Sequence, residues 1–315
     1  MSFLLLIIGF LFLIKGADLF VEGAASIARK FNVPAMVIGL TIVAMGTSAP
    51  EAAVSITSSL AGQNDMSVAN VVGSNFFNIL VVLGVSSIIT KLPVQNNTIK
   101  KDGPFLLLVS GLLLLFGFNL NISRIEGFIF LAVFAYFLFS TVKSSKNTTL
   151  NNVDEAAISI DVETDEQASM PKTILLSVIG IVGIVIGGDM VVDSATSIAT
   201  SFGMSANLVG LTIVAVGTSL PEFVTSVVAI KKGETEIAIG NVIGSNVFNI
   251  LLVLGLATTI KPITISMLAL TDITFMVAIT ILLYLFMKKD NSLVKKHGII
   301  LVAIYIAYMS YTIMR

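Results

Sequence analysis

The sequence predicts an all-α polytopic membrane protein in which ten transmembrane helices form two inverted five-helix repeats. Apolar residues make up 56% of the 315 positions and charged residues only 12%, whereas soluble chains carry about 25% charged residues. The chain also divides into ten apolar segments, and two long motifs each occur twice at one fixed spacing. A soluble fold of this size could not bury so much apolar surface, so the sequence indicates a protein embedded in lipid.

The spans follow from apolar length, since a membrane helix needs about 20 mostly apolar residues. The first has no basic region before it and no clear cleavage site after it, so we interpret it as a membrane helix and not a signal peptide. The first, second and sixth spans are long enough to tilt, and the fourth is short. In order, the spans cover residues 2–28, 34–60, 67–90, 103–119, 125–142, 172–199, 206–230, 237–260, 266–287 and 297–314.

One segment between the spans is polar and acidic. Residues 144–171 contain six Asp or Glu residues and are predicted to be a solvated linker. A regulatory cation-binding role is the alternative, although the D-x-D-x-D-G loop pattern that would specify one is missing. The predicted organisation is therefore a first five-helix repeat at 1–143, a cytoplasmic acidic linker at 144–171, and a second, inverted repeat at 172–315.

The distribution of Lys and Arg predicts the orientation, because these residues concentrate in cytoplasmic loops. Ten spans place on one side Arg29, Lys30, Lys91, Lys100, Lys101, Lys143, Lys146, Lys172, Lys231, Lys232, Lys288, Lys289, Lys295 and Lys296. The other side has only Arg124, Lys261 and Arg315. Both termini are therefore expected outside the cytoplasm, with the protein in the cytoplasmic (inner) membrane.

An internal repeat relates the two halves. Residues 39–51 read GLTIVAMGTSAPE and residues 210–222 read GLTIVAVGTSLPE. Residues 70–84 read NVVGSNFFNILVVLG and residues 241–255 read NVIGSNVFNILLVLG. Both pairs are offset by 171 residues. Because five spans is an odd number, the second half enters the bilayer from the opposite side, as in secondary transporters, whose substrate site lies at the repeat interface.

Two glutamates, Glu51 and Glu222, lie near the middle of long apolar spans. A carboxylate at the bilayer centre is costly, and its presence marks a functional site by default. A single such glutamate could be a protonated structural residue. Two at equivalent repeat positions favour a shared ion site between the halves.

The residues before each glutamate supply further oxygens. Thr47 and Ser48 precede Glu51 by four and three residues, and on a continuous helix they would share a face with it. Pro50 has no N–H and leaves the carbonyl of Gly46 without its helical partner, so the span is predicted to break beside the carboxylate, where it lines a cavity. The second half repeats this pattern with Gly217, Thr218, Ser219, Pro221 and Glu222.

The second motif adds hydroxyl and amide oxygens. Ser74 and Asn78 are four residues apart and are expected on one helix face; their equivalents are Ser245 and Asn249. The rival interpretation is close helix packing at small residues, namely Gly73, Ser74, Gly244 and Ser245. The neighbouring asparagines, Asn75 and Asn246, are expected to point elsewhere and to hydrogen-bond between helices.

The assembled site contains only oxygen ligands, which suit hard cations such as Na⁺ or Ca²⁺. Its two carboxylates balance one Ca²⁺ or two monovalent ions, so competition at one site is physically plausible. Four other acidic residues are expected to be caps, vestibule groups or ion-pairing groups, with Lys15 a candidate partner for Asp18. They are Asp18, Glu22, Asp189 and Asp193.

Other functions are excluded by missing residue types. The chain has no cysteine and one histidine, which excludes thiolate and multi-histidine metal sites. It has neither an H-E-x-x-H motif nor a phosphate-binding loop. We therefore predict that the protein is not an enzyme, that it needs no cofactor, and that ion gradients drive the transport. The net charge of −1 argues against a nucleic-acid partner. The expected partners are the transported ions and the lipid bilayer, with no obligate protein partner.

At these motifs, the chain resembles the calcium/cation antiporter superfamily, specifically the prokaryotic sodium/calcium exchangers. The resemblance covers nearly the whole chain and implies alternating access, in which the first and sixth helices slide across the other eight. It also implies that the carbonyls of Ala44 and Ala215 join the side-chain ligands. Asn249 differs from some relatives, including potassium-dependent exchangers, which carry Asp there.

The resulting hypothesis is an antiporter that expels Ca²⁺ against an inward Na⁺ gradient. The GTS-x-PE form resembles sodium-type exchangers, whereas the proton-coupled branch usually has a GNATE-like segment there. A proton/Ca²⁺ antiporter, with Glu51 and Glu222 as proton carriers, is the closest alternative. A passive cation channel is a third, which predicts flux without dependence on a counter-ion.

Overall fold

The computed structural model describes residues 2–62, 64–153, 170–203 and 215–314, and these are helical over most of their length. Helices satisfy every backbone polar group internally, as a bilayer requires. Six helices of the described residues are long and apolar enough to cross a membrane, or seven when one bent pair counts as a single span. The all-α membrane class is therefore confirmed, and the ten-span count stays a prediction.

The first half consists of long helices interrupted by π-helical turns, labelled η. Each predicted span of this half coincides with a helical segment. The elements are α1 (Ser2–Lys30), α2 (Ala35–Ile38), η1 (Gly39–Val43), α3 (Ala44–Thr47), α4 (Ala49–Leu60), α5 (Asn64–Phe77), η2 (Asn78–Val82), α6 (Leu83–Ile89), η3 (Thr98–Asp102), α7 (Gly103–Gly117) and α8 (Arg124–Val153).

The second half follows the same order of elements, except that the residues equivalent to η3 belong to α15. The segment that corresponds to α2 and η1, residues 206–214, lies outside the described residues. The elements are α9 (Met170–Ser201), α11 (Ala215–Gly217), α12 (Leu220–Lys231), α13 (Thr235–Phe248), η5 (Asn249–Leu254), α14 (Gly255–Ile260), α15 (Met267–Asp290) and α16 (Lys295–Met314).

The predicted linker begins as helix. α8 continues to Val153, so the helix of the fifth span extends into the predicted linker. An apolar-length criterion ends a span at its first polar residues, but a helix can continue into water when its own backbone hydrogen bonds persist. The acidic residues of the linker lie in 154–169, outside the described residues, and its solvated character stays a prediction.

Four two-residue strands join loops from the two halves. β1 (Leu92–Pro93) pairs antiparallel with β4 (Ser292–Leu293), and β2 (Asn121–Ile122) pairs antiparallel with β3 (Ile263–Thr264). Two residues are too few to produce an alternating sequence pattern, so these strands could not be predicted from the sequence. Each pair ties a loop of the first half to a loop of the second.

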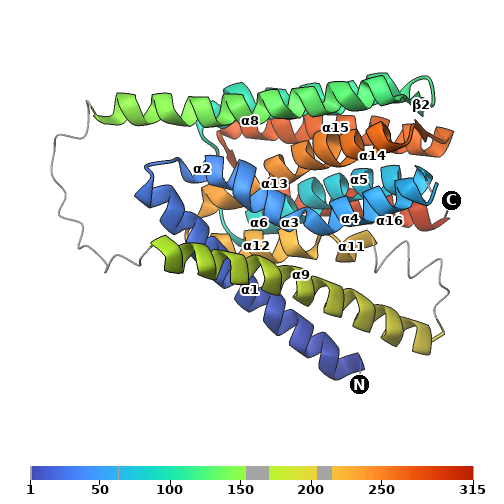
Figure 1. Ribbon diagram of the computed structural model, residues 1–315, viewed down its shortest axis with the longest axis horizontal. Coiled ribbons are helices and arrows are strands. Elements are labelled where there is room, and N and C mark those ends of the chain that lie inside the picture. The colour runs from blue at the N-terminus through green and yellow to red at the C-terminus, as the bar shows by residue number, and fades with distance from the viewer. Residues whose placement is uncertain (1, 63, 154–169, 204–214, 315) are drawn as a thin grey trace.

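Helices α1 and α9 pack along a seam of glycines. Gly9 and Gly16 of α1 are seven residues apart, as are Gly180 and Gly187 of α9, and residues at this spacing lie on the same side of a helix. A Cβ added at Gly16 would lie 2.7 Å from the Gly180 carbonyl oxygen, and one added at Gly187 would lie 2.7 Å from the Gly9 carbonyl oxygen. Figure 1 shows the pair as two long antiparallel helices beside the other elements.

The centre of the protein is α13, whose residues from Ile237 to Phe248 are all buried. It lies among elements of the first half, as the mixed colours in Figure 1 show. Glycines again permit the contact, since a Cβ at Gly240 would lie 2.6 Å from the Met36 carbonyl oxygen and one at Gly39 would lie 2.7 Å from the Ile237 carbonyl oxygen. The first broken span therefore packs backbone to backbone against the second half.

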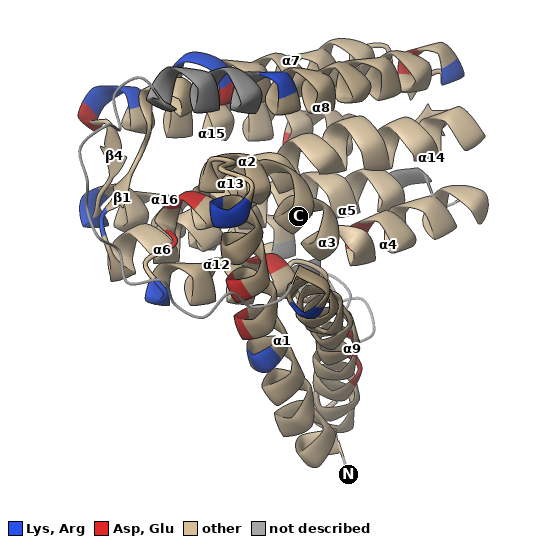
Figure 2. Cartoon of the chain, turned by 60° about the vertical axis from the view of Figure 1, so that its left-hand side comes forward, with Lys and Arg blue, Asp and Glu red and all other residues tan. Residues whose placement is uncertain are grey.

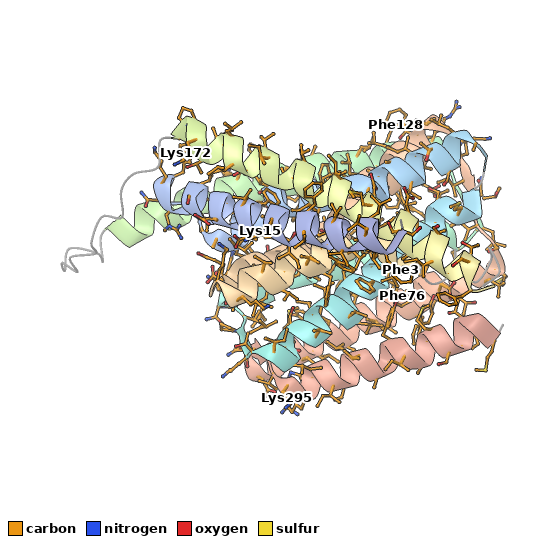
Figure 3. All side chains as sticks on the ribbon, turned by 90° about the horizontal axis from the view of Figure 1, so that it is seen from below. Phe3, Lys15, Phe76, Phe128, Lys172 and Lys295 are labelled. Atoms are coloured by element: carbon orange, nitrogen blue, oxygen red, sulfur yellow. The ribbon has the colours of Figure 1, made fainter. Side chains whose placement is uncertain are left out.

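Charged residues lie mainly toward helix ends, and the helices between are largely uncharged (Figure 2). Lys172 and Lys295 lie at one end of the molecule, and Phe128 lies at the other (Figure 3). At the end of α12, Lys232 Nζ lies 2.9 Å from an Asp18 carboxylate oxygen and 3.2 Å from a Glu22 carboxylate oxygen, both on α1. Asp18 thus pairs with Lys232, and the expected pairing with Lys15 is wrong because the side chains are brought together by folding and not by helical spacing.

Candidate functional site between the two broken helices

Both spans that carry the repeated Gly-Thr-Ser-x-Pro-Glu motif are broken. The helix from Ala35 to Thr47 and the helix from Ala49 to Leu60 are bent by 50° relative to each other, with Ser48 between them in a non-helical conformation. In the second half, α11 ends at Gly217 and α12 begins at Leu220. Pro50 and Pro221 lie in the first turn of the following helices, where the missing N–H costs nothing. The predicted break is confirmed.

The breaks bring the two glutamates into one buried cluster. Ser48 Oγ donates a hydrogen bond of 2.9 Å to Glu222 Oε1, and Ser219 Oγ donates one of 2.9 Å to Glu51 Oε1. Both carboxylates are fully buried, with an exposed fraction of 0%. Each glutamate is therefore bound by the serine that precedes the other glutamate by three residues.

This pairing adds to what the sequence predicts for the two serines. A continuous helix would place Ser48 on the same face as Glu51, but the break turns the Ser48 side chain toward the opposite half. Ser219 does the same toward Glu51. A serine and a glutamate three residues apart in the chain thus contribute to hydrogen bonds with opposite halves of the site.

The second motif contributes one serine to each carboxylate. Ser74 Oγ, on α5, donates to Glu51 Oε1 at 3.4 Å, and Ser245 Oγ, on α13, donates to Glu222 Oε1 at 3.4 Å. Both serines are buried. In contrast to Ser48 and Ser219, they contact the glutamate of their own half. Each Oε1 atom therefore accepts one hydroxyl from each half of the chain.

The threonines contact two asparagines, Asn70 and Asn241, that are not among the predicted ligands. Thr47 Oγ1 donates to Asn241 Oδ1 at 3.1 Å, and Thr218 Oγ1 donates to Asn70 Oδ1 at 3.5 Å. These asparagines open the second repeated motif and follow the glutamates by 19 residues in both halves. Their identical position in both motifs was the signal available in the sequence.

Asn78 and Asn249 each begin a π-helical turn, at η2 and η5. Asn78 Nδ2 donates to Asn246 Oδ1 at 3.1 Å, and Asn249 Nδ2 donates to Asn75 Oδ1 at 3.5 Å. The expected hydrogen bonds of Asn75 and Asn246 between helices are confirmed. π-Helical turns are frequent at functional sites, and the amide nitrogens here are held so that each Oδ1 remains available.

Four buried oxygens in this cluster accept no hydrogen bond from any described residue. They are Glu51 Oε2, Glu222 Oε2, Asn78 Oδ1 and Asn249 Oδ1. Buried polar atoms are nearly always paired, so such a group of atoms calls for an explanation. No group of three or more His, Cys, Asp or Glu occurs in the described part of the chain, and the donor set fits a hard cation better than a transition metal.

The resemblance implies two backbone ligands, the carbonyls of Ala44 and Ala215, and the structure describes contacts for the first of them. The Ala44 carbonyl oxygen accepts the Ser48 N–H at 3.0 Å and faces Thr47 Oγ1 at 3.4 Å. It lies at the end of the first broken helix, beside the cluster. Ala215 begins α11, immediately after the undescribed residues. Both assignments stay predictions.

The other acidic residues lie away from this cluster. Asp18 and Glu22, on α1, form ion pairs with Lys232 at the end of α12. Asp189 and Asp193 are exposed on α9 and form no ion pair with any described residue. A cavity of about 470 Å³ lies elsewhere, between α2, α7 and α8, and none of the predicted ligands lines it.

Known proteins resemble this chain over nearly its whole length. Residues 1–143 and 172–314 match the family model described as sodium/calcium exchanger protein. The sodium/calcium exchanger MaX1 of Methanosarcina acetivorans is 33% identical over 98% of this chain and 97% of that protein. The inner membrane protein YrbG of Escherichia coli is 36% identical over 88% of this chain and 86% of that protein.

A solved structure gives the same result. The sodium-calcium exchanger NCX_Mj, soaked with zero Na⁺ and Ca²⁺, matches with a TM-score of 0.86 and 32% identity, covering 99% of this chain and 98% of that one. The buried pair of glutamates, the doubled motifs and these matches lead to one conclusion: the chain belongs to the sodium/calcium exchanger protein family.

Proposed function

We propose that this protein expels Ca²⁺ from the cytoplasm in exchange for Na⁺, and that both ions bind between Glu51 and Glu222. The observation that carries the proposal is the set of four buried oxygens without donors around these glutamates. A dehydrated cation supplies what they lack. The predicted ligand set comprises Glu51, Glu222, Thr47, Thr218, Ser48, Ser219, Ser74, Ser245, Asn78, Asn249 and the carbonyls of Ala44 and Ala215.

Charge explains why exchange is the expected mode. The two carboxylates carry two negative charges, which one Ca²⁺ or two Na⁺ ions neutralise. Leaving the pair uncompensated in a buried site is costly, so release of one kind of ion is coupled to binding of the other. Asn249 contributes no further charge, and the exchange is accordingly expected to be independent of K⁺.

Flux measured in vesicles tests this function. The purified protein is reconstituted into liposomes loaded with Na⁺, and uptake of radioactive Ca²⁺ is followed after dilution into Na⁺-free buffer. We expect uptake that requires the Na⁺ gradient and does not change when K⁺ is added. Uptake driven by a pH gradient alone would indicate the proton antiporter, and uptake without any counter-ion gradient would indicate a channel.

The arrangement of the loops supports ten spans in two inverted repeats. With that count, β1 and β4 both lie on the Lys-rich side, and β2 and β3 both lie on the other. The ion pair between Arg29 and Glu234 also joins two loops of the Lys-rich side. We therefore propose that this side faces the cytoplasm and that both termini lie outside it.

Cysteine labelling in intact cells is expected to confirm this orientation. The chain has no cysteine, so each introduced one is the only target. A membrane-impermeant maleimide should label Asn119→Cys, in an exposed extracytoplasmic loop, and should leave Asn97→Cys unlabelled until the cells are opened. The reverse pattern would contradict the proposed orientation.

Alternating access requires that α1 and α9 move relative to the other helices. The ion pairs of Lys232 with Asp18 and Glu22 join α1 to the end of α12 and keep the cytoplasmic side of the site covered. The repeat offset of 171 residues places Ala61 at the position of Lys232, opposite Asp189 and Asp193 of α9. Among the described residues, Asp189 and Asp193 therefore form no equivalent ion pairs on the extracytoplasmic side. We expect the conformation closed toward the cytoplasm and the one closed toward the outside to differ in stability.

Lys232→Met is expected to favour separation of α1 from α12. Exposed ion pairs contribute about 0.2–1 kcal/mol each, so their loss changes the ratio of the two conformations several-fold. Spin labels at Lys30→Cys and Lys231→Cys report the distance between the helix ends. We expect a larger population at long distance in Lys232→Met, but not in Lys295→Met, which removes one charge on the same side. Identical distance distributions for wild type and Lys232→Met would contradict the role of these pairs.

A further inference from the structure

The two asparagines that open the second repeated motif, Asn70 and Asn241, make the same three contacts in both halves. Asn241 Nδ2 donates to the Glu222 carbonyl oxygen at 3.4 Å and to Ser226 Oγ at 3.1 Å, while its Oδ1 accepts from Thr47 Oγ1 at 3.1 Å. The corresponding contacts of Asn70 are with the Glu51 carbonyl oxygen at 3.1 Å, Ser55 Oγ at 2.8 Å and Thr218 Oγ1 at 3.5 Å. In each case the threonine belongs to the opposite half.

The amide orientation is fixed by these partners. A backbone carbonyl can only accept hydrogen bonds, so the nitrogen of each asparagine must face the glutamate carbonyl. Its Oδ1 must then face the threonine of the other half, which makes that threonine the donor. The assignment follows from the hydrogen-bond partners and does not depend on seeing the hydrogen atoms.

The orientation of the asparagine amide determines where the threonine hydroxyl donates its proton. A hydroxyl has one proton and two lone pairs, and the Thr47 hydroxyl has four acceptors near it. They are Asn241 Oδ1 at 3.1 Å, the Val43 carbonyl oxygen at 3.2 Å, the Ala44 carbonyl oxygen at 3.4 Å and the Glu222 carboxylate. Without Asn241, the proton would be shared between the Glu222 carboxylate and the carbonyls of its own helix, which an ordinary helical threonine uses. With Asn241, the proton points across the interface, and the oxygen lone pairs are held in a set direction.

These asparagines differ from the two predicted amide ligands. Asn78 and Asn249 each have an Oδ1 atom without a donor, whereas neither Asn70 nor Asn241 has an unpartnered buried atom. Their amides are occupied by protein contacts, and Asn241 is fully buried. They are therefore placed to act through their neighbours and not as ion ligands.

We propose that Asn70 and Asn241 are positioning residues for ion binding, each of which orients the threonine hydroxyl of one half against the glutamate of the other. Asn241 links Thr47 to the backbone of Glu222, and Asn70 links Thr218 to the backbone of Glu51. This inference rests on the proposed exchange of Na⁺ and Ca²⁺. It explains how the ligands of the two halves are held in a fixed arrangement relative to each other.

A double-mutant cycle on Na⁺-dependent Ca²⁺ uptake tests the proposal. We expect Asn241→Ala to raise the KM for Ca²⁺ about tenfold, the size of effect that one well-placed hydrogen bond produces, with a smaller change in the maximal rate. Thr47→Val should raise the KM by a similar factor. The double variant should resemble Thr47→Val, because Asn241 has no further effect on the KM once the hydroxyl that it orients is gone.

The matched control is Ser59→Ala. Ser59 is buried on α4 and donates to the Ala257 carbonyl oxygen at 3.1 Å, so it also forms a buried hydrogen bond between the halves, but away from the glutamates. Its loss should leave the KM for Ca²⁺ unchanged. A general weakening of the interface would raise the KM in Ser59→Ala as well, and that result would contradict a specific positioning role.

Two further results would overturn the proposal. One is an unchanged KM in Asn241→Ala, and the other is a double variant whose KM rises by the product of the two single effects. If Asn241→Ala does not fold, the half-buried Asn70 gives the same test through Asn70→Ser paired with Thr218→Val. Lack of Na⁺-dependent uptake by the wild type would contradict the proposed function itself, which keeps the two failures distinct.

Discussion

Glu51→Gln and Glu222→Gln are each expected to reduce Na⁺-dependent Ca²⁺ uptake at least about a hundredfold while the protein still inserts and folds. Each change removes one of two buried charges that face the proposed cation, and removing one partner of a buried charged pair costs about 3–5 kcal/mol. The amide keeps the shape of the side chain and can still accept from the serine hydroxyls. Uptake into liposomes measures the effect on transport.

Ca²⁺-dependent thermal stabilisation measures binding in the same variants. A ligand that binds only the folded state raises the melting temperature by an amount that grows with the logarithm of its concentration divided by its dissociation constant. The wild type should therefore be stabilised by Ca²⁺, and the two variants should not. Glu236→Gln, at the start of α13, is the control with the same chemical change outside the cluster. Near-normal Ca²⁺ uptake in both Glu51→Gln and Glu222→Gln would show that the ions bind elsewhere.

Gly180→Ala is expected to destabilise the pairing of α1 with α9 and to slow exchange. The added Cβ would lie 2.7 Å from the Phe20 backbone nitrogen and 2.8 Å from the Gly16 carbonyl oxygen. Backbone atoms cannot turn aside as a side chain can, so the helices must separate. Overpacking of this kind costs about 1–3 kcal/mol, and thermal unfolding in detergent, together with uptake in liposomes, measures the loss.

Gly111→Ala is the matched control on α7. No described atom lies within 4 Å of a Cβ added at Gly111, and alanine is the better helix former by up to about 1 kcal/mol. The two substitutions are chemically identical but should have opposite signs of effect on stability. Equal stability of Gly180→Ala and the wild type would show that α1 and α9 do not depend on this close contact.

The sequence predicted the helices and the glutamates of the site, but it did not predict which side chains contact each other there. Apolar length located the helices, and Pro50 and Pro221 predicted the breaks, because both signals act through the local backbone. The offset of 171 residues singled out Glu51 and Glu222 as a pair. The exchange of partners, in which Ser48 binds Glu222 and Ser219 binds Glu51, followed from no local pattern, since it depends on the direction of each helix after its break.

The π-helical turns and the role of Asn70 and Asn241 were missed for a similar reason. A π turn differs from an α-helix by one extra residue in a turn, and the apolar pattern around Asn78 and Asn249 fits either. Asn70 is a polar residue at the start of a motif, and its sequence neighbours do not indicate that it faces Thr218 from the other half. The contacts of Asn70 and Asn241 depend on how α5 and α13 pack against the broken helix of the opposite half.

The sequence by itself determined the membrane environment, the helical class, the repeated motifs and the chemical nature of the site, because composition, apolar length and residue type are properties of the chain. The tertiary structure alone decided which hydroxyl serves which carboxylate, which amides remain available and which lysine pairs with α1. Those contacts join residues that are far apart in the chain, and only the packing of one half against the other brings these residues within hydrogen-bonding distance.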